Sequence, residues 1–318
     1  MTDGAAVAVV ITTYGRADLL PRLATALDAQ EVDGPVEVVV YDDASVDDTP
    51  RVLAEWAARA RHPVTVLRGE ANRGPSAGRN AGWRATTAPL VVFTDDDCVP
   101  APGWLAAHVA AAAGATRVSV GRTQPAESQR AHEGPFSRTL RVDDARYFQT
   151  CNVAYPRALL ERLEGFDEEL RTGEDVDMGL RATEAGAGVV FTPEAFVEHD
   201  VRPSSLALAL RDATRWVDIP RVVRKHPAAR REYLHRSIFW KVTHLDALLL
   251  VAGAALARRQ PLALALALPW LRRRSGPWRP AGTSTRRLVV SLPGLLAVDL
   301  VETATMVRGS IKHRSPML

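Results

Sequence analysis

The segment Pro89-Leu-Val-Val-Phe-Thr94, followed directly by Asp95-Asp96-Asp97, decides the fold prediction for this chain. A continuous apolar run of this length is typical of a strand that is buried on both faces of a parallel sheet. Open α/β sheets bind ligands outside the carboxyl ends of their strands, which is where the three carboxylates stand. Crowded carboxylates repel one another, and hard oxygen ligands of this kind bind Mg²⁺ or Mn²⁺. The segment therefore predicts a metal-phosphate site, with a solvated acidic turn as the alternative.

The residues before this segment repeat a unit of apolar run, turn and amphipathic stretch. The first apolar run is Val7–Ile11, and residues 18–29 after it carry leucines at helical spacing. Residues 36–41 and 64–67 have the composition of two further strands, and the second leads into a glycine-rich turn at 72–82. Strands that alternate with helices predict a mostly parallel sheet with right-handed crossovers. The predicted fold class is therefore α/β, with a Rossmann-like sheet flanked by helices.

The turn after the first strand separates this chain from two common nucleotide-binding classes. A dinucleotide-binding fold needs the pattern G-x-G-x-x-G there, and Thr12-Thr-Tyr-Gly-Arg16 does not supply it. The phosphate-binding pattern G-x-x-x-x-G-K-[ST] does not occur in the sequence either. These two observations exclude NAD-dependent enzymes and P-loop ATPases.

Five segments in a fixed order make the chain resemble the family 2 glycosyltransferases, which use the GT-A nucleotide-diphosphosugar fold. The segments are Thr12–Arg16, Asp42–Ser45 with Asp48-Thr49, Asn72–Gly82, Asp95–Asp97 and Gly173–Arg181. Each alone could arise by chance, but the ordered set is specific and covers about residues 7–200. The stretches 151–157 and 165–168 also match the family. The resemblance implies a GT-A catalytic domain over residues 1–203, with nucleotide-sugar binding at about 1–100 and the acceptor side at about 101–203.

On the donor side, the resemblance assigns roles that the side chains can support chemically. Thr12 and Tyr14 would line the base pocket, where the tyrosine ring offers a flat face to the base. Asp43 would accept a hydrogen bond from a base N–H, with an Asx turn or helix cap as the alternative. Arg79 would contact phosphate or sugar through its forked donors, or else form a surface salt bridge. The other residues assigned to donor binding are Arg16, Asn72, Asp95 and Asp96.

The metal ligands and the general base follow from the same resemblance. Asp95 and Asp97 form the D-x-D pattern, in which Asp97 would contact the metal and Asp96 would face the sugar or ribose. His199 matches a position where some relatives add a histidine ligand, although a lone histidine is more often structural. Asp175 would be the general base, and its place near a helix N-terminus favours the ionised form.

The implied reaction is direct displacement at the anomeric carbon, with inversion of configuration. Asp175 would take the acceptor proton, while a divalent metal, Mn²⁺ or Mg²⁺, offsets charge on the departing nucleoside diphosphate. Asn152 and Glu174 would lie on the acceptor side. Processive synthases carry Gln-x-x-Arg-Trp where this chain has Asp212-Ala-Thr-Arg-Trp216, so we expect transfer of a single sugar. The alternatives from other classes are a sugar nucleotidyltransferase and a non-catalytic nucleotide-binding scaffold.

Residues 204–318 have the composition of a basic, apolar helical extension. Two apolar runs, Leu245–Ala257 and Leu262–Leu271, are each shorter than the roughly 20 residues that span a bilayer. We therefore expect a helical hairpin that makes peripheral membrane contact through residues 235–275. Three tryptophans would lie at headgroup depth in that arrangement: Trp240, Trp270 and Trp278. A buried hairpin and a dimer interface are the competing interpretations.

Composition agrees with an α/β enzyme. A chain of 318 residues with 47% hydrophobic content can bury a sizeable core. The two cysteines, Cys98 and Cys151, imply no disulfide framework, and we expect Cys98 to have a packing role. Residues 1–6 do not resemble a secretory signal, which favours the cytoplasm and the cytoplasmic face of the membrane. The expected partners are a nucleotide-diphosphosugar donor and a glycan or lipid-linked acceptor of the cell envelope; nucleic acid is not expected.

Overall fold

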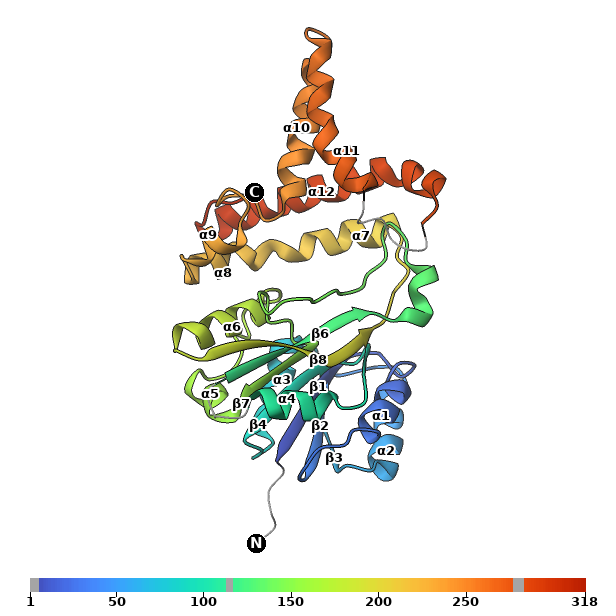
Figure 1. Ribbon diagram of the computed structural model, residues 1–318, viewed down its shortest axis with the longest axis vertical. Coiled ribbons are helices and arrows are strands. Elements are labelled where there is room, and N and C mark those ends of the chain that lie inside the picture. The colour runs from blue at the N-terminus through green and yellow to red at the C-terminus, as the bar shows by residue number, and fades with distance from the viewer. Residues whose placement is uncertain (1–5, 113–116, 277–282) are drawn as a thin grey trace. The chain divides into compact units, whose positions relative to one another are not determined.

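The computed structural model describes residues 6–112, 117–276 and 283–318 (Figure 1). The chain divides into two compact units. The first consists of Met1–Glu127 with Thr139–Asp200, and the second of Ser128–Arg138 with Val201–Leu318. Each unit has a hydrophobic core of its own.

The first unit is built on an eight-stranded sheet with the strand order β3-β2-β1-β4-β7-β6-β8-β5. The strands are β1 (Val7–Thr13), β2 (Val36–Asp42), β3 (Val64–Arg68), β4 (Leu90–Asp95), β5 (Cys98–Pro100), β6 (Arg117–Pro125), β7 (Asn152–Pro156) and β8 (Gly188–His199). The pairs β1–β2, β1–β4, β2–β3 and β6–β8 are parallel. The pairs β4–β7, β6–β7 and β5–β8 are antiparallel. The predicted α/β class is confirmed, and the antiparallel strands all enter after the acidic triplet.

Helices flank this sheet as the alternation of apolar runs predicts. They are α1 (Leu20–Asp28), α2 (Thr49–Arg59), α3 (Pro75–Arg84), α4 (Trp104–Ala112), α5 (Arg157–Arg162) and α6 (Glu174–Glu184). The helix predicted at residues 18–29 is confirmed as α1. The side chains of β1 and β4 are almost all inaccessible to solvent, as expected for strands covered on both faces.

The predicted glycine-rich turn at residues 72–82 is mostly helical, because α3 already begins at Pro75. Its glycines serve helix packing on β1 and β2. A Cβ atom at Gly78 would lie 2.6 Å from the Thr12 side chain, and one at Gly82 would lie 2.4 Å from Val10. Only a residue without a side chain permits so close an approach, so these glycines place α3 directly on the strands that end at the acidic edge.

The second unit is helical. Its elements are α7 (Leu206–Ala213), α8 (Ile219–Lys225), α9 (Ala229–Tyr233), α10 (Val242–Leu256), α11 (Leu268–Ser275) and α12 (Thr285–His313), with the 3₁₀ segments η1 (Glu127–His132), η2 (Thr214–Asp218) and η3 (Pro261–Ala267). The predicted hairpin is present, because α10 packs against η3 and α11. A Cβ atom at Gly253 would lie 2.5 Å from the carbonyl oxygen of Ala263, so this glycine allows the two arms to touch.

The helix α12 lies beyond the predicted hairpin. Its 29 residues make it one helix in the described chain that is long and apolar enough to cross a membrane. Two acids within it are buried and paired. Asp299 accepts a hydrogen bond of 2.8 Å from the Trp270 indole and forms an ion pair with Arg274. Glu302 lies 2.8 Å from the Lys241 ammonium. Buried, paired acids of this kind are typical of a helix that packs within protein.

One expectation about the tryptophans is wrong. Trp270 is only 2% exposed and packs in a small core with Leu288 and Leu295, so it does not stand at a surface. Its indole N–H needs a buried acceptor, and Asp299 supplies one. Trp240 is half-buried, and Trp278 lies outside the described residues.

Candidate active site

The carboxyl ends of β1, β2 and β4 meet at one edge of the sheet because these strands are parallel. In the register, Thr12 lies opposite both Tyr41 of β2 and Asp95 of β4. The loops that follow the three strands therefore carry Tyr14, Asp43 and the acidic triplet to the same edge. This arrangement brings together most of the residues that are predicted to bind the nucleotide-sugar donor.

Hydrogen bonds fix the loop after β1 against the loop after β2. The backbone N–H of Gly15 donates to the Ser45 hydroxyl at 2.9 Å, and that of Arg16 donates to the Thr49 hydroxyl at 2.9 Å. Tyr14, on the same loop, remains 49% exposed. The backbone after Tyr14 is therefore anchored, while about half of the Tyr14 side chain is exposed to solvent.

Asp43 is buried and stabilises the loop before α3. Its carboxylate accepts hydrogen bonds from the backbone N–H groups of Arg73, at 2.9 Å, and Gly74, at 2.8 Å. Gly74 has a φ of +89°, a conformation that favours glycine. Asn72, also predicted for donor binding, is exposed on this loop. These hydrogen bonds are long-range contacts and not an Asx turn or a side-chain cap of α3, and contact of Asp43 with a base stays a prediction.

Arg79 joins the end of β4 to α6. Its guanidinium is buried and donates to Glu174 at 2.9 Å and to Asp95 at 3.2 Å. It also lies 5.8 Å from the centroid of the Phe166 ring. The salt bridge considered for Arg79 exists, but its predicted location at the surface is wrong. Sequence could not reveal this network, because 95 positions separate Arg79 from Glu174.

Asp175, the predicted general base, lies in the first turn of α6. Burial, and after it the charge of Glu174, raise the pKa of Asp175 to about 7. The helix N-terminus does favour the ionised form, as expected, but the net shift of the pKa is upward because burial dominates. The helix contributes a hydrogen bond of 2.8 Å from the Val176 N–H, but the loss of water around the carboxylate outweighs this contact.

Tyr155 was not singled out in the sequence, although it belongs to a stretch that matches the family. Its ring is fully buried on β7, and its hydroxyl has no hydrogen-bond partner among the described residues. Burial, followed by the charge of Asp175, raises the pKa of Tyr155. An unpartnered hydroxyl in the field of Asp175 is thus a further polar group beside the predicted base.

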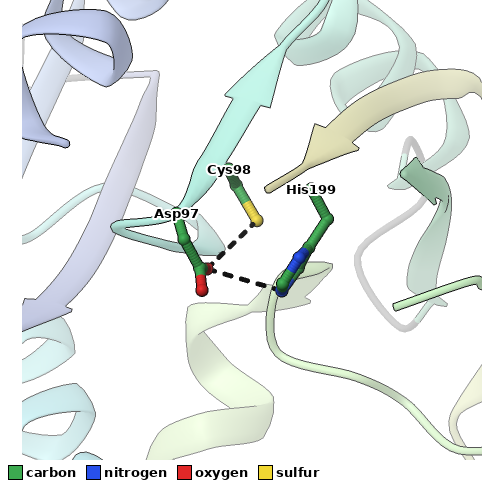
Figure 2. Close-up of side chains that lie close together, drawn as sticks. All are labelled: Asp97, Cys98 and His199. Carbon is green, nitrogen blue, oxygen red and sulfur yellow. Dashed lines mark hydrogen bonds and ion pairs between the residues drawn. The ribbon is translucent and has the colours of Figure 1, made fainter. Parts of the chain in front are cut away.

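Asp97, Cys98 and His199 form a cluster of three potential metal ligands (Figure 2). Oδ1 of Asp97 lies 3.5 Å from Nε2 of His199 and 4.0 Å from Sγ of Cys98. Strand pairing explains the cluster, because Cys98 lies opposite His199 in the β5–β8 register. Asp97 and His199 are the predicted ligands among these residues, whereas the role predicted for Cys98 is packing.

The donor atoms of this cluster fit a divalent metal ion. All three lie within 4.8 Å of one another, and they combine a carboxylate, an imidazole and a thiol. Asp95, predicted as a third ligand, pairs instead with Arg79. Burial, and next the contact with Cys151, raise the pKa of the Cys98 thiol.

Asp96 stands beside the cluster, with its Oδ1 atom 3.9 Å from Nε of Arg16. Burial and the neighbouring Asp97 raise the pKa of Asp96 to about 7. Both causes act because a negative charge is unfavourable where water is excluded and another carboxylate is near. The ionised form of Asp96 is therefore unfavourable at this edge of the sheet.

Asn152 was predicted on the acceptor side, and the structure does not support that placement. It is 1% exposed and makes four hydrogen bonds within the core. Its amide group donates to the carbonyl oxygens of Arg122 and Ala195, at 2.9 and 2.8 Å. Its oxygen accepts from Trp104 at 2.8 Å and lies 2.9 Å from Nε2 of His108. This uses its full hydrogen-bonding capacity, so Asn152 ties β7 to β6, β8 and α4.

The fold belongs to the GT-A class, and solved structures share it. The mannosyltransferase PcManGT from Pyrobaculum calidifontis, in complex with GDP-Man and Mn²⁺, is 22% identical, with a TM-score of 0.59 over 98% of this chain and 88% of that chain. S. aureus TarS 1-349, in complex with UDP, is 19% identical, with a TM-score of 0.52 over 97% of this chain and 91% of that chain.

Comparison of sequences gives the family. Residues 8–163 match the model of glycosyl transferase family 2, and residues 138–272 match that of glycosyl transferase family group 2. The chain belongs to the family 2 glycosyltransferases. Validoxylamine A glucosyltransferase of Streptomyces hygroscopicus subsp. jinggangensis is 30% identical over 74% of this chain and 63% of its own length. Pre-mycofactocin glycosyltransferase of Mycobacterium tuberculosis is 30% identical over 62% of this chain and 43% of its own length. The chain thus spans less than two thirds of these relatives.

Proposed function

We propose that the chain is an inverting glycosyltransferase that moves a single sugar from a nucleotide-diphosphosugar to an acceptor hydroxyl. The observation that carries this proposal is the buried Arg79, which binds Asp95 at the end of β4 and Glu174 at the start of α6. Because Asp175 follows Glu174 directly, the donor edge and the proposed base belong to one connected network.

In the proposed reaction, a bond forms between the acceptor oxygen and the anomeric carbon while the bond to the diphosphate breaks. Asp175 accepts the proton of the acceptor hydroxyl, and a single displacement inverts the anomeric configuration. A carboxyl group whose pKa is raised to about 7 holds that proton better than an ordinary aspartate does. Positioned base catalysis of this kind contributes roughly 10² to 10⁴ in rate.

The donor would bind along the carboxyl edge of β1, β2 and β4. Tyr14 would offer its exposed ring to the base, beside Thr12. Asp43 accepts two loop amides but keeps lone pairs for a base N–H. Further donor contacts are proposed for Arg16, Asn72 and Asp96. The donors in the structures of PcManGT and TarS, GDP-Man and UDP-GlcNAc, agree with a nucleotide-sugar ligand.

Asp97 and His199 would hold a divalent metal ion, Mn²⁺ or Mg²⁺, at this edge. Such an ion supplies positive charge that stabilises the diphosphate as it leaves. Asp95 would act through Arg79, whose position it fixes. Glu174 remains proposed for the acceptor side. It lies at the start of α6, where it forms an ion pair with Arg79.

The helical unit carries a proposed membrane contact within residues 235–275. Leu262 is 90% exposed in η3, and Leu264 and Leu268 are also exposed. Arg258 and Arg259, before η3, are exposed as well. Exposed leucines beside arginines are typical of segments that lie in the interface of an anionic membrane. Because of this contact, we also propose that the acceptor is lipid-linked or belongs to the cell envelope.

Donor hydrolysis tests the proposal. The purified chain is incubated with Mn²⁺ and a panel of UDP-, dTDP- and GDP-sugars, with and without a chelator. We expect slow, metal-dependent hydrolysis of one donor, and its loss in Asp97→Ala. A scaffold would bind nucleotide and leave every donor intact. A nucleotidyltransferase would instead make a nucleotide-sugar from a sugar phosphate and release pyrophosphate, and either result would overturn the proposal.

A further inference from the structure

The metal cluster contains one donor that the proposed reaction does not require, the thiol of Cys98 (Figure 2). Hard oxygen ligands suffice for Mg²⁺, and a thiol is a poor ligand for that ion. The position of Cys98 beside Asp97 and His199 therefore bears on which metal this chain selects.

The spacing of the three donor atoms matches one coordination geometry. Metal bonds of about 2.0–2.3 Å in a tetrahedron place neighbouring ligand atoms about 3.3–3.8 Å apart. The Asp97 oxygen lies 3.5 Å from the His199 nitrogen and 4.0 Å from the Cys98 sulfur. All three atoms lie within 4.8 Å of one another, so small side-chain rotations would close the site.

His199 is oriented for metal binding by the backbone. Its Nδ1 atom lies 2.8 Å from the carbonyl oxygen of Asp200, an acceptor, so Nδ1 carries the hydrogen and donates it. With Nδ1 occupied in this way, Nε2 is the ring atom left to face Asp97 and to bind a metal, an arrangement that ligating histidines share. A carboxylate oxygen and an imidazole lone pair that face each other need a cation or a proton between them.

We propose that Cys98 is a metal ligand and that Asp97, Cys98 and His199 form a mixed oxygen, sulfur and nitrogen centre. Such a donor set selects a borderline ion such as Zn²⁺ or Co²⁺ over Mg²⁺. Three protein ligands leave a fourth position open, as in catalytic sites, where a donor phosphate oxygen can bind. The inference rests on the proposed function, because it adds a ligand and a class of metal to the metal site of that reaction.

Metal binding at this centre releases one proton. The sulfur–hydrogen bond of Cys98 breaks as the sulfur–metal bond forms, and the proton leaves to solvent. No electron is transferred, so the step needs no oxidant. Zn²⁺ or Co²⁺ binding is therefore accompanied by proton release, whereas Mg²⁺ held by oxygen and nitrogen alone leaves the thiol intact.

Titration of the metal-free chain with Co²⁺ tests the inference, because a cobalt–thiolate bond produces a charge-transfer absorption in the near ultraviolet. The matched variants are Cys98→Ser and Cys151→Ala. Both cysteines are buried, and Cys151→Ala leaves Cys98 as the only thiol in the chain. We expect the absorption in the wild type and in Cys151→Ala, and its loss in Cys98→Ser together with a Co²⁺ affinity about tenfold or more weaker.

The Cys151→Ala spectrum decides the matter even if Cys98→Ser does not fold. An absorption there can arise only from Cys98, and its absence at saturating Co²⁺ overturns the inference. Cobalt that binds Cys98→Ser as tightly as the wild type overturns it as well. Neither result affects the proposed transfer reaction, whose failure would instead appear as intact donors across the hydrolysis panel.

Discussion

Asp175 combines two opposing effects within one side chain. The helix N-terminus stabilises its charge, whereas burial and the neighbouring Glu174 destabilise it, and the raised pKa shows that burial dominates. We expect Asp175→Asn to fold normally and to lose about 10²- to 10⁴-fold of its transfer rate. Steady-state transfer measures this, with Glu184→Gln at the exposed end of α6 as the control. Near-normal turnover by Asp175→Asn would remove Asp175 from the base role.

The same residue predicts the pH dependence. The base acts in its ionised form, so kcat/KM should rise as the pH increases through about 7 and level off above it. Folding stability should change in the opposite sense. Because the folded pKa lies above the ordinary value of 3.8, the folded chain binds the proton more tightly than the unfolded chain. Stability is therefore lost as the pH rises through this window, and Asp175→Asn should abolish that part of the loss in thermal melts.

Arg79 holds two carboxylates that would otherwise be left without a cation. Replacing it with methionine should destabilise the first unit by about 3–5 kcal/mol, because breaking a buried ion pair leaves uncompensated charge. Arg79→Lys should recover only part of this, since an ammonium lacks the fork that reaches both Asp95 and Glu174. Denaturant unfolding measures the difference. Arg84→Met, an exposed position on the same helix, is the control, and an equal effect there would contradict the argument.

Local motifs predict which residues belong to the candidate site more readily than they predict the contacts that those residues make. Asp97 and His199 were named from sequence and do lie together. The ion pairs of Arg79 and the core bonds of Asn152 were not foreseen, because their partners are distant in the chain. Cys98 is assigned a packing role from sequence because β5 has only three residues, too few to show that Cys98 would pair with His199.

At the level of elements, α3 is placed by its glycines. The Cβ atom that alanine adds at position 82 would lie 2.4 Å from Val10, so Gly82→Ala must push α3 away from β1. Overpacking of this kind costs about 1–3 kcal/mol. Chemical denaturation should show the loss, and donor binding should weaken as Arg79 moves with the helix. Gly188→Ala is the control, because a Cβ there makes only ordinary contact, and equal destabilisation would argue against a packing role.

The strands β1, β2 and β4 could be predicted because each is an apolar run, and α1 and α2 because of their helical periodicity. The start of α3 could not, because its glycines indicated a turn. The helix α12 could not, since Pro293, Asp299 and Glu302 interrupt its apolar pattern. Those acids are tolerated only because Trp270, Arg274, Lys241 and His244 supply partners from other helices. These pairs are tertiary contacts, which a local stretch of sequence does not reveal.

At the scale of the whole molecule, the two units differ in their exposed apolar surface. We expect the chain to float with vesicles that contain anionic lipid, and to be released by salt, because arginines contribute to the binding. Leu262→Asn with Leu264→Asn should reduce flotation. Val46→Asn is the control, because Val46 is 92% exposed but belongs to the first unit. Retention of the wild type in the soluble fraction at low salt would remove the membrane proposal.

The pairing of β5 with β8 also has a consequence for the order of events during synthesis. Asp97 and Cys98 leave the ribosome about a hundred residues before His199, and within the described sheet β5 pairs with β8 alone. The donor-binding half can therefore begin to fold on the growing chain, since its strands β1 to β4 are complete by Asp95. The proposed metal centre must wait for residue 199. A nascent chain that stalls before that point would lack the histidine of that proposed centre.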